Sequence, residues 1–333
     1  MTTSSSFQSF KSNLFSAGAR QKLLAFASLV GLLIFFSLAS NNFMKIDNML
    51  GILQSTAVNG VLAIACTFVI ITAGIDLSIG TLMTFCAVMA GVFLANMGLP
   101  LVVGVPGTIL AGALVGMFSG TLIAKLKVPP FIATLGVMML LKGASLVISE
   151  TKPIYFNDVE HFSSISQDSL IGSIALFEKF PIPNSVLILF LVAILASFIL
   201  NKTVLGTYTF ALGSNEEAVR LSGVRVDRWK ITIYSLCGAL CGIAGLLMAS
   251  RLNSAQPALG QGYELDAIAA AVIGGTSLNG GSGTILGTII GAFIISVLTN
   301  GLRILSVAQE WQYIVTGGII ILAVYTDTLR KRK

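Results

Sequence analysis

Charged residues gather in one short stretch of this sequence, ALGSNEEAVRLSGVRVDRW at 211–229, which holds six charges in nineteen positions. Within it, SNEE matches a capping box, in which the Ser214 side chain accepts a backbone N–H and Glu217 reaches back to the Ser214 amide. Gly223 stands where a helix ends in a left-handed residue. The pattern predicts a helix of about eight residues over 215–222, which must dock because helices this short are marginal in water.

A single carboxylate, Asp76, interrupts two long stretches without charge, at 49–75 and 77–124, and it is flanked by Gly74 and Gly80. An ionisable group at membrane depth is costly and by default indicates a functional site. The sequence DLS is also typical of a helix start, with Asp76 as the N-cap. We expect a capping or hinge role for Asp76 rather than direct recognition of a ligand.

Several kinds of chemistry have no support in the sequence. There is no G-x-x-x-x-G-K-[ST] phosphate loop, and the nearest Gly-rich run, GGTSLNGGSGTILG at 274–287, has no Lys to reach phosphates. The four cysteines, Cys66, Cys86, Cys237 and Cys241, all fall in apolar segments, where packing is the expected role rather than disulfides or metal binding. No nucleophile has an identifiable base nearby. These absences argue against an enzyme and against ATP binding by this chain.

The amino-acid composition indicates the class of protein to which this chain belongs. Apolar residues make up 55% and charged residues 10% of the chain, against about 45–50% and about 25% in soluble domains. The mean hydropathy is +0.91. A membrane-spanning helix needs about 20 apolar residues, and the longest charge-free stretches hold two such lengths. The chain is therefore predicted to be an all-α polytopic membrane protein.

Turn-forming residues divide the apolar stretches into about ten predicted spans. The breaks fall at Gly74/Asp76, Asn96 to Pro100, Pro129/Pro130 and Asn279 to Gly283. The predicted spans are 23–40, 50–72, 77–97, 101–124, 130–149, 185–200, 230–250, 264–276, 284–303 and 310–326. No A-x-A-type cleavage site follows the first apolar segment, so a retained span is expected there rather than a signal peptide.

Basic residues predict the orientation, because cytoplasmic loops are enriched in Lys and Arg. With the N-terminus inside, 14 of the 20 basic residues fall on the inner side. These are Lys11, Arg20, Lys22, Lys125, Lys127, Lys202, Arg220, Arg225, Arg228, Lys230, Arg330, Lys331, Arg332 and Lys333. The prediction is N-in and C-in, and the net charge of +6 is explained by anionic lipid rather than by nucleic acid.

This orientation also predicts domains and internal symmetry. A cytoplasmic tail at 1–22 precedes a transmembrane domain at 23–326, which includes a cytoplasmic loop at 201–229, and a basic tail follows at 327–333. The second to fifth and the seventh to tenth spans each contain a Gly-rich break, TAGIDLSIG and GGTSLNGGSG. Because the two sets would run in opposite directions, they are predicted to form inverted-topology halves.

Two roles are open for the short helix in the inner loop. It could lie on its own bundle or on the lipid surface, with Arg220 and Arg225 only adding positive charge on the inner side. It could instead dock a cytoplasmic partner. Glu216 and Glu217 near its start and the arginines beyond it complement the helix dipole, but they also offer both signs of charge to a partner.

A family resemblance favours the docking role. The string ALGSNEEAVRLSGVRV resembles the coupling-helix region of permease subunits in bacterial ATP-binding cassette (ABC) sugar importers, of the branch that contains the ribose permeases within the branched-chain amino acid and sugar permease superfamily. The resemblance runs from about residue 40 to the C-terminus. Three further stretches carry it: ITAGIDLSIG at 71–80, PPFIATLGVMMLLKG at 129–143 and RLNSAQPALGQGYELDAIAAAVIGGTSLNGG at 251–281.

The resemblance implies a division of labour among several chains. This chain would transport a monosaccharide, ribose or a related pentose, across the bacterial inner membrane beside a second permease copy, two ATPase subunits and a periplasmic sugar-binding protein. ATP and Mg²⁺ would be bound by the ATPases, so no cofactor is expected in this chain. The residues implied to couple to the ATPase are Gly213, Ser214, Asn215, Glu216, Glu217, Ala218, Arg220, Leu221, Ser222 and Gly223.

A pathway for a neutral sugar needs amides, hydroxyls and aromatic faces, since a sugar hydroxyl both donates and accepts. The candidates for the pathway or its gate are Gln54, Asn59, Asp76, Ser78, Asn253, Gln256, Tyr263, Glu264, Asp266 and Asn300. Gln54 and Asn59 lie about 140° apart around one helix, so a narrow pore could not easily use both. For each amide, a hydrogen bond to a neighbouring helix is an equally good explanation.

A cation-coupled secondary sugar transporter is the alternative function. Such a protein needs a network of ionisable groups within the membrane to carry the coupling ion. In this sequence only Asp76 and Lys142 offer candidates.

Overall fold

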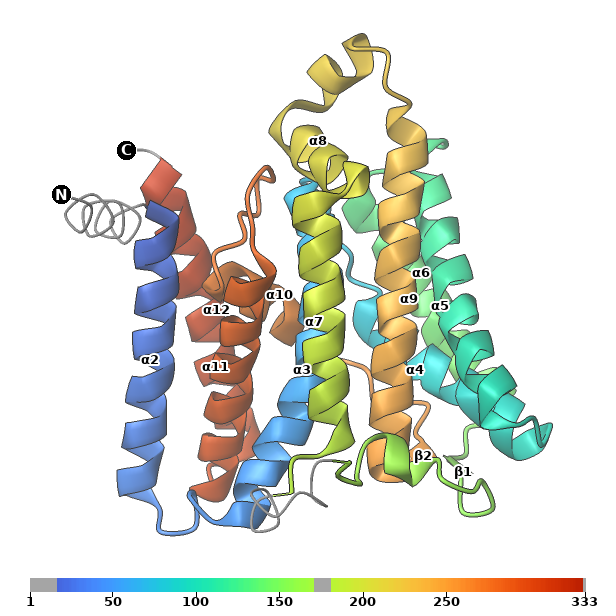
Figure 1. Ribbon diagram of the computed structural model, residues 1–333, viewed down its shortest axis with the longest axis vertical. Helices are drawn as coiled ribbons and strands as arrows, with labels where there is room; N and C mark the ends of the chain where they lie inside the picture. Colours follow the sequence, from blue (N-terminus) through green and yellow to red (C-terminus); the bar gives the residue numbers. More distant parts are fainter. Residues whose placement is uncertain (1–16, 171–180, 332–333) are drawn as a thin grey trace, which may run out of the picture.

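The computed structural model describes residues 17–170 and 181–331, which fold into a bundle of long helices that stand side by side (Figure 1). This architecture confirms the predicted all-α polytopic class. The helices are α2 (Ala17–Ala39), α3 (Ile46–Ile71), α4 (Ile79–Ala90) with its π-helical continuation η1 (Gly91–Asn96), α5 (Leu101–Ala124), α6 (Pro130–Ile148), the short 3-10 helix η2 (Ser163–Ile165), α7 (Asn184–Lys202), α8 (Val204–Leu221), α9 (Val226–Leu252), α10 (Tyr263–Ile273), α11 (Ile285–Ile304) and α12 (Gln309–Lys331).

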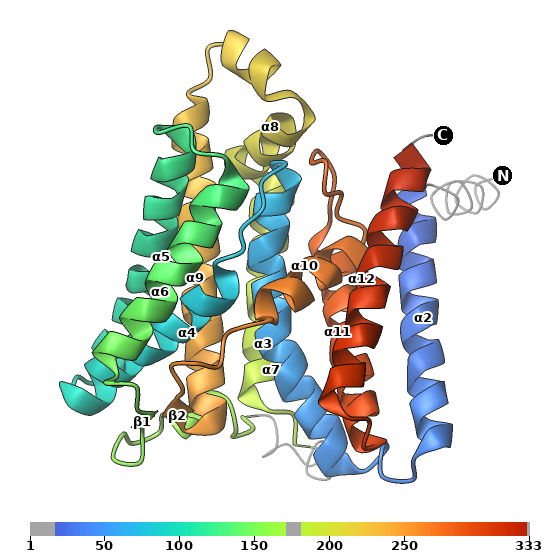
Figure 2. The same ribbon diagram turned by 180° about the vertical axis from the view of Figure 1, so that it is seen from behind.

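Eight helical segments of the described chain are long and apolar enough to cross a membrane: α2, α3, α4 with η1, α5, α6, α7, α9 and α11. The predicted span at 264–276 corresponds to α10, which has only 11 residues, whereas about 20 are needed for a continuous helix to cross. Gly274 and Gly275 end it, and Figure 2 shows the following segment continuing toward the end of the bundle that carries both chain termini.

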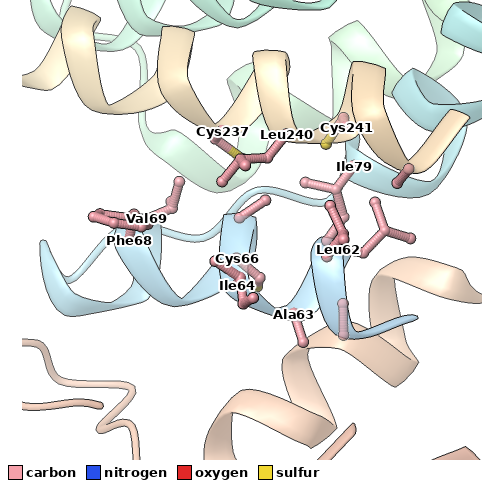
Figure 3. Packing of buried hydrophobic residues seen from close by; sticks show 14 of the residues in the cluster. Leu62, Ala63, Ile64, Cys66, Phe68, Val69, Ile79, Cys237, Leu240 and Cys241 are labelled. Carbon is pink, nitrogen blue, oxygen red and sulfur yellow. The ribbon is translucent and has the colours of Figure 1, made fainter. Parts of the chain in front are cut away.

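Helix α3 is the centre of the bundle and packs against α7, α9, α10 and α11. Its second half, from Thr56 onward, is almost entirely buried. Figure 3 shows Leu62 and Val69 of α3 beside Cys237 and Leu240 of α9. All four cysteines are buried and free, in agreement with the predicted packing role.

Glycines allow α5 and α9 to approach closely. A Cβ atom on Gly112 would collide with the carbonyl oxygen of Gly238, and one on Gly116 would collide with that of Tyr234. Apolar burial does not drive helices together in lipid, so close backbone contact between small residues is the main source of affinity. This contact between α5 and α9, which we call the glycine seam, holds α9 in place. Helix α9 begins next to the predicted docking helix.

The segment 201–229, predicted as a loop with one short helix, is mostly helical. Thr203 caps α8 by accepting a hydrogen bond from the Gly206 amide at 3.5 Å, and the helix then runs to Leu221 with a kink at Asn215. The run VLGTYTFALG forms this extension and buries Gly206, Thr209 and Leu212 along one side. Figure 1 shows α8 at the same end of the bundle as both termini.

The opposite end of the bundle carries a small β-ribbon. Strands β1 (Ile154–Tyr155) and β2 (Ser254–Ala255) pair antiparallel and join the segment after α6 to the end of α9. The α8 kink and this ribbon therefore mark the two ends of the molecule (Figure 1).

Candidate coupling and translocation sites

The docking helix is capped by Asn215, not by Ser214 as the capping box predicts. Asn215 leaves helical geometry, with φ −160° and ψ 97°, and its side-chain oxygen accepts the Ala218 amide at 2.9 Å. Asn and Ser are about equally good N-caps. A capping box needs Glu or Gln three residues after the cap, and with Asn215 as the cap that position is held by Ala218 instead of Glu217. The result is a short helix over 216–221, which we call the coupling helix.

The end of the coupling helix matches the prediction. The Ser222 amide donates to the Ala218 carbonyl at 3.0 Å and the Gly223 amide donates to the Arg220 carbonyl at 3.1 Å. Gly223 has φ +81°, which a residue with a Cβ adopts only at a cost.

An ion-pair network ties the coupling helix to the bundle. Glu216 lies 2.6 Å from Lys230 and 3.0 Å from Arg220, Arg220 lies 3.8 Å from Asp227, and Asp227 lies 3.0 Å from Lys127. Partial burial of Glu216 opposes its ionisation, but the hydrogen bonds and positive charges of Lys230 and Arg220 outweigh it and lower the pKa of this carboxyl. Each exposed pair is worth about 0.2–1 kcal/mol, so the network serves mainly to orient the helix.

Three segments meet directly beneath the kink. The Gly281 amide, in the segment between α10 and α11, donates to the Ile71 carbonyl at the end of α3 at 2.8 Å. Gly213 lies against both groups so closely that a Cβ there would collide with the Ile71 carbonyl oxygen. A movement of the coupling helix would therefore press on α3 and on the 274–284 segment together.

The other face of the coupling helix points away from the bundle. Leu221 is 83% exposed, and Glu217 and Ala218 are exposed beside it. Within the described chain, Glu217 forms no ion pair. These three side chains are therefore accessible to another molecule.

The second candidate region is the break between α3 and α4. Asp76 is only 2% exposed, and its Oδ1 accepts the Ser78 amide at 2.8 Å and the Ser78 hydroxyl at 2.6 Å. The predicted N-cap role was wrong in position, because α4 begins at Ile79 with Ser78 as its N-cap residue. Asp76 instead fixes the turn in front of α4, because its carboxylate accepts the backbone N–H of Ser78.

Thr134 of α6 also holds this break, and sequence reasoning missed it. Its hydroxyl accepts the Leu77 amide at 3.2 Å and lies 3.3 Å from the Ile75 carbonyl. Nothing local to Thr134 signals this contact, because it joins residues more than fifty positions apart. Only its place in the family-like stretch PPFIATLG could have indicated it.

Two short helices begin next to each other inside the bundle. Gly80 in the first turn of α4 lies against the Gly260 carbonyl, and Gly260 in turn lies against the Gly80 carbonyl, so neither position has room for a Cβ. Glu264 in the first turn of α10 is buried, and both of its carboxylate oxygens accept the Gly262 amide at 3.1 Å. Figure 2 shows α4 and α10 side by side in the interior. Interrupted helices of this kind form substrate sites in many transporters.

The remaining predicted pathway residues fall into two groups. Gln54 and Asn59 on α3, Tyr263 and Asp266 on α10 and Asn300 on α11 are all partly buried. The Asn300 side-chain oxygen is buried without a hydrogen-bond partner among the described residues.

The other group lies at the β-ribbon end. Asn253 ends α9 in a left-handed conformation, with φ +49°, and donates to Asn157 at 3.0 Å. Gln256 donates to Ser254 at 3.1 Å. The side chains of these two amides are engaged in hydrogen bonds at the ribbon, not with a neighbouring helix.

Comparison with known proteins identifies the family. The family model of the branched-chain amino acid transport system / permease component matches residues 48–324. The chain belongs to this permease family. It is 42% identical to the ribose import permease protein RbsC of Escherichia coli (strain K12) over 307 residues, which are 91% of this chain and 94% of the relative.

More distant relatives agree with this assignment. The ribose import permease protein RbsC of Bacillus subtilis (strain 168) is 40% identical over 93% of this chain and 94% of its own length. The xylose transport system permease protein XylH of Haemophilus influenzae is 37% identical over 91% of this chain and 94% of its own length. No solved structure matches the chain. As a permease with several apolar spans, the protein is a multi-pass transport subunit of the inner membrane and not an enzyme.

Proposed function

We propose that this permease carries ribose, or a closely related pentose, across the inner membrane as the membrane subunit of an ABC importer. The observation that carries the proposal is the 42% identity, along 91% of the chain, to a permease named for ribose import. Relatives named for xylose and fructose are 37% identical. Their greater distance supports ribose over the other two sugars.

The proposed topology has ten crossings, N-in and C-in, in two inverted halves. Eight crossings are the long apolar segments. The ninth is α10 together with the 274–284 segment, and the tenth is α12. The start of α2 and the end of α12, which lie at the same end of the bundle as α8 (Figure 1), and the 14 inner basic residues support this assignment. The tails at 1–22 and 327–333 would then be cytoplasmic.

The proposed assembly contains two copies of this permease, two ATPase subunits and a periplasmic sugar-binding protein. ATP and Mg²⁺ would be bound by the ATPases, because the permease has no phosphate-binding loop and no Lys in its Gly-rich run. We propose no cofactor for this chain. Affinity for the sugar would reside mainly in the binding protein, since a permease that held sugar tightly would release it slowly.

The coupling helix would dock on the ATPase through Glu217 and Leu221. ATP-driven movement of the ATPase would shift the coupling helix together with α9, because the ion pair between Glu216 and Lys230 joins the two. The contact of Gly213 with Ile71 and Gly281 would pass the movement to α3 and to the segment after α10. Coupling of this kind requires contacts that differ between the two states of the transporter.

The translocation pathway would pass the junction of α4 and α10. Tyr263, Asp266 and Asn300 supply an aromatic face, a carboxylate and an amide for sugar hydroxyls. Asp76 and Ser78 would hold the break before α4 in one arrangement and release it in the other, which is a gating role. Gln54 and Asn59 remain candidates on the central helix.

Competition between sugars tests the proposed substrate. In proteoliposomes that contain the permease with its ATPase and binding protein, unlabelled ribose should suppress uptake of labelled ribose more strongly than equal concentrations of xylose or fructose. Stronger suppression by fructose than by ribose would contradict the proposal.

A further inference from the structure

A hollow of about 460 Å³ opens between α8 and the start of α9. It lies beside the coupling helix, at the end of the bundle that carries both termini (Figure 1). The residues that shape it are Tyr208, Gly223, Arg225, Arg228, Trp229 and Thr232. None of them has a role in the coupling or transport steps described above apart from Gly223.

The hollow contains positive charge that no carboxylate of the described residues neutralises. Arg225 and Arg228 are exposed, and in the part of the chain that the structure describes neither forms an ion pair. The carboxylate between them in sequence, Asp227, is engaged by Lys127 at 3.0 Å and Arg220 at 3.8 Å. The two guanidinium groups are therefore available to an anion from outside the chain.

The depth of the hollow indicates what kind of anion reaches it. No charged residue occurs at 231–250, so a stretch apolar and long enough to cross a membrane follows directly after Arg228 and Lys230. The rings of Tyr208 and Trp229 lie 4.7 Å apart in a tilted pair that also lines the hollow. Tyr and Trp side chains concentrate at the level of lipid headgroups, where their rings meet both water and acyl chains.

We propose that this hollow binds the phosphate of an anionic phospholipid. Arg225 and Arg228 would hold the phosphate, for which the planar guanidinium is well matched, and the Tyr208–Trp229 pair would contact the glycerol and the first acyl carbons. Because Gly223 ends the coupling helix and also lines the hollow, a bound lipid would brace the coupling helix from the membrane side.

Native mass spectrometry of the full importer tests the proposal. The complex is placed in phosphatidylcholine nanodiscs with phosphatidylglycerol as the probe, and the phosphatidylglycerol retained after release is counted. Arg225→Gln with Arg228→Gln should reduce retention about thirtyfold, which corresponds to about 2 kcal/mol for two basic residues at the surface. The control is Lys125→Gln with Lys202→Gln, which removes the same charge from exposed sites outside the hollow and should reduce retention much less than the arginine variant.

Fluorescence gives an independent readout that does not depend on release from the membrane. The chain has two Trp residues, so Trp311→Phe leaves Trp229 as the reporter in this subunit. In a permease reconstituted without Trp-containing partners, brominated phosphatidylglycerol should quench Trp229 more than brominated phosphatidylcholine, and the arginine double variant should abolish the difference.

Four results would overturn the proposal. These are unchanged retention in the arginine variant, equal losses in the lysine control, displacement of the lipid by inorganic phosphate alone, and loss of the ATPase subunit without loss of lipid. The third would assign the hollow to a free phosphate and the fourth would assign it to the protein partner. Both variants change exposed side chains, so a normal elution profile of the complex serves as the check on folding.

Discussion

Nζ of Lys230 lies 2.6 Å from Oε2 of Glu216, and this contact joins the start of α9 to the start of the coupling helix. Lys230 is the more buried partner, with 18% of its side chain exposed against 39% for Glu216. Because glycines let α9 pack closely on α5, the pair anchors the coupling helix to the bundle.

Removing this anchor should uncouple transport more than it destabilises the protein. Lys230→Met keeps the aliphatic stem and breaks the pair, so the free energy of unfolding should fall by about 1 kcal/mol or less, while sugar carried per ATP hydrolysed falls severalfold. Lys202→Met, at an exposed lysine without an ion pair in the described chain, is the control. Unchanged coupling in Lys230→Met would show that the pair does not hold the coupling helix.

The cap of the coupling helix can be assigned by comparing two neighbouring positions. Asn215→Ala should cost about 0.5–2 kcal/mol and raise local opening of the helix about twofold to thirtyfold. Ser214→Ala should have little effect, since its side chain does not cap the helix. Hydrogen exchange of the amides at 216–222 measures the difference. Greater opening in Ser214→Ala than in Asn215→Ala would show that Ser214 caps the helix, as in the capping box that the sequence predicts.

Asp76 should act on gating rather than on sugar recognition. Asp76→Asn keeps an acceptor for the Ser78 amide, whereas Asp76→Ala leaves that buried amide unsatisfied at a cost of about 1–3 kcal/mol. Transport of ribose and xylose, each with its cognate binding protein, should therefore fall by the same factor, and further in Ala than in Asn. Losses that differ between the sugars, with ATPase coupling intact, would show that Asp76 contacts the substrate.

The proposed orientation can be tested at the two ends of the molecule. In a background without the native cysteines, Glu160→Cys near the β-ribbon should react with an impermeant maleimide added from outside. Ala218→Cys on the coupling helix should react only after permeabilisation, and inverted vesicles should give the opposite pattern. Labelling of both positions from one side would refute the topology.

The sequence contained most of the information that determines the large elements. Charge-free stretches predicted the long spans, since a membrane helix has a simple requirement for apolar length. The break at Gly74 and Asp76 and the left-handed Gly223 followed from local backbone preferences, which short motifs carry.

Contacts between distant segments could not be predicted in the same way. Thr134 holds the break before α4 from another helix, and Gly213 is buried against Ile71 and Gly281. These relationships exist only after the helices pack. The choice of Asn215 over Ser214 as the cap was also undecided locally, because both side chains fit the role.

ATP-driven uptake is the most direct test of the central claim that this permease couples partner ATPases to sugar transport through the coupling helix. Labelled ribose is measured in proteoliposomes that contain the permease with its ATPase and binding protein, beside the same system with Leu221→Asp, which places a charge on the exposed docking face. We predict uptake that requires ATP and both partners and that is lost in Leu221→Asp at normal membrane abundance. Uptake by the permease alone, driven by a cation gradient and unaffected by Leu221→Asp, would contradict the account.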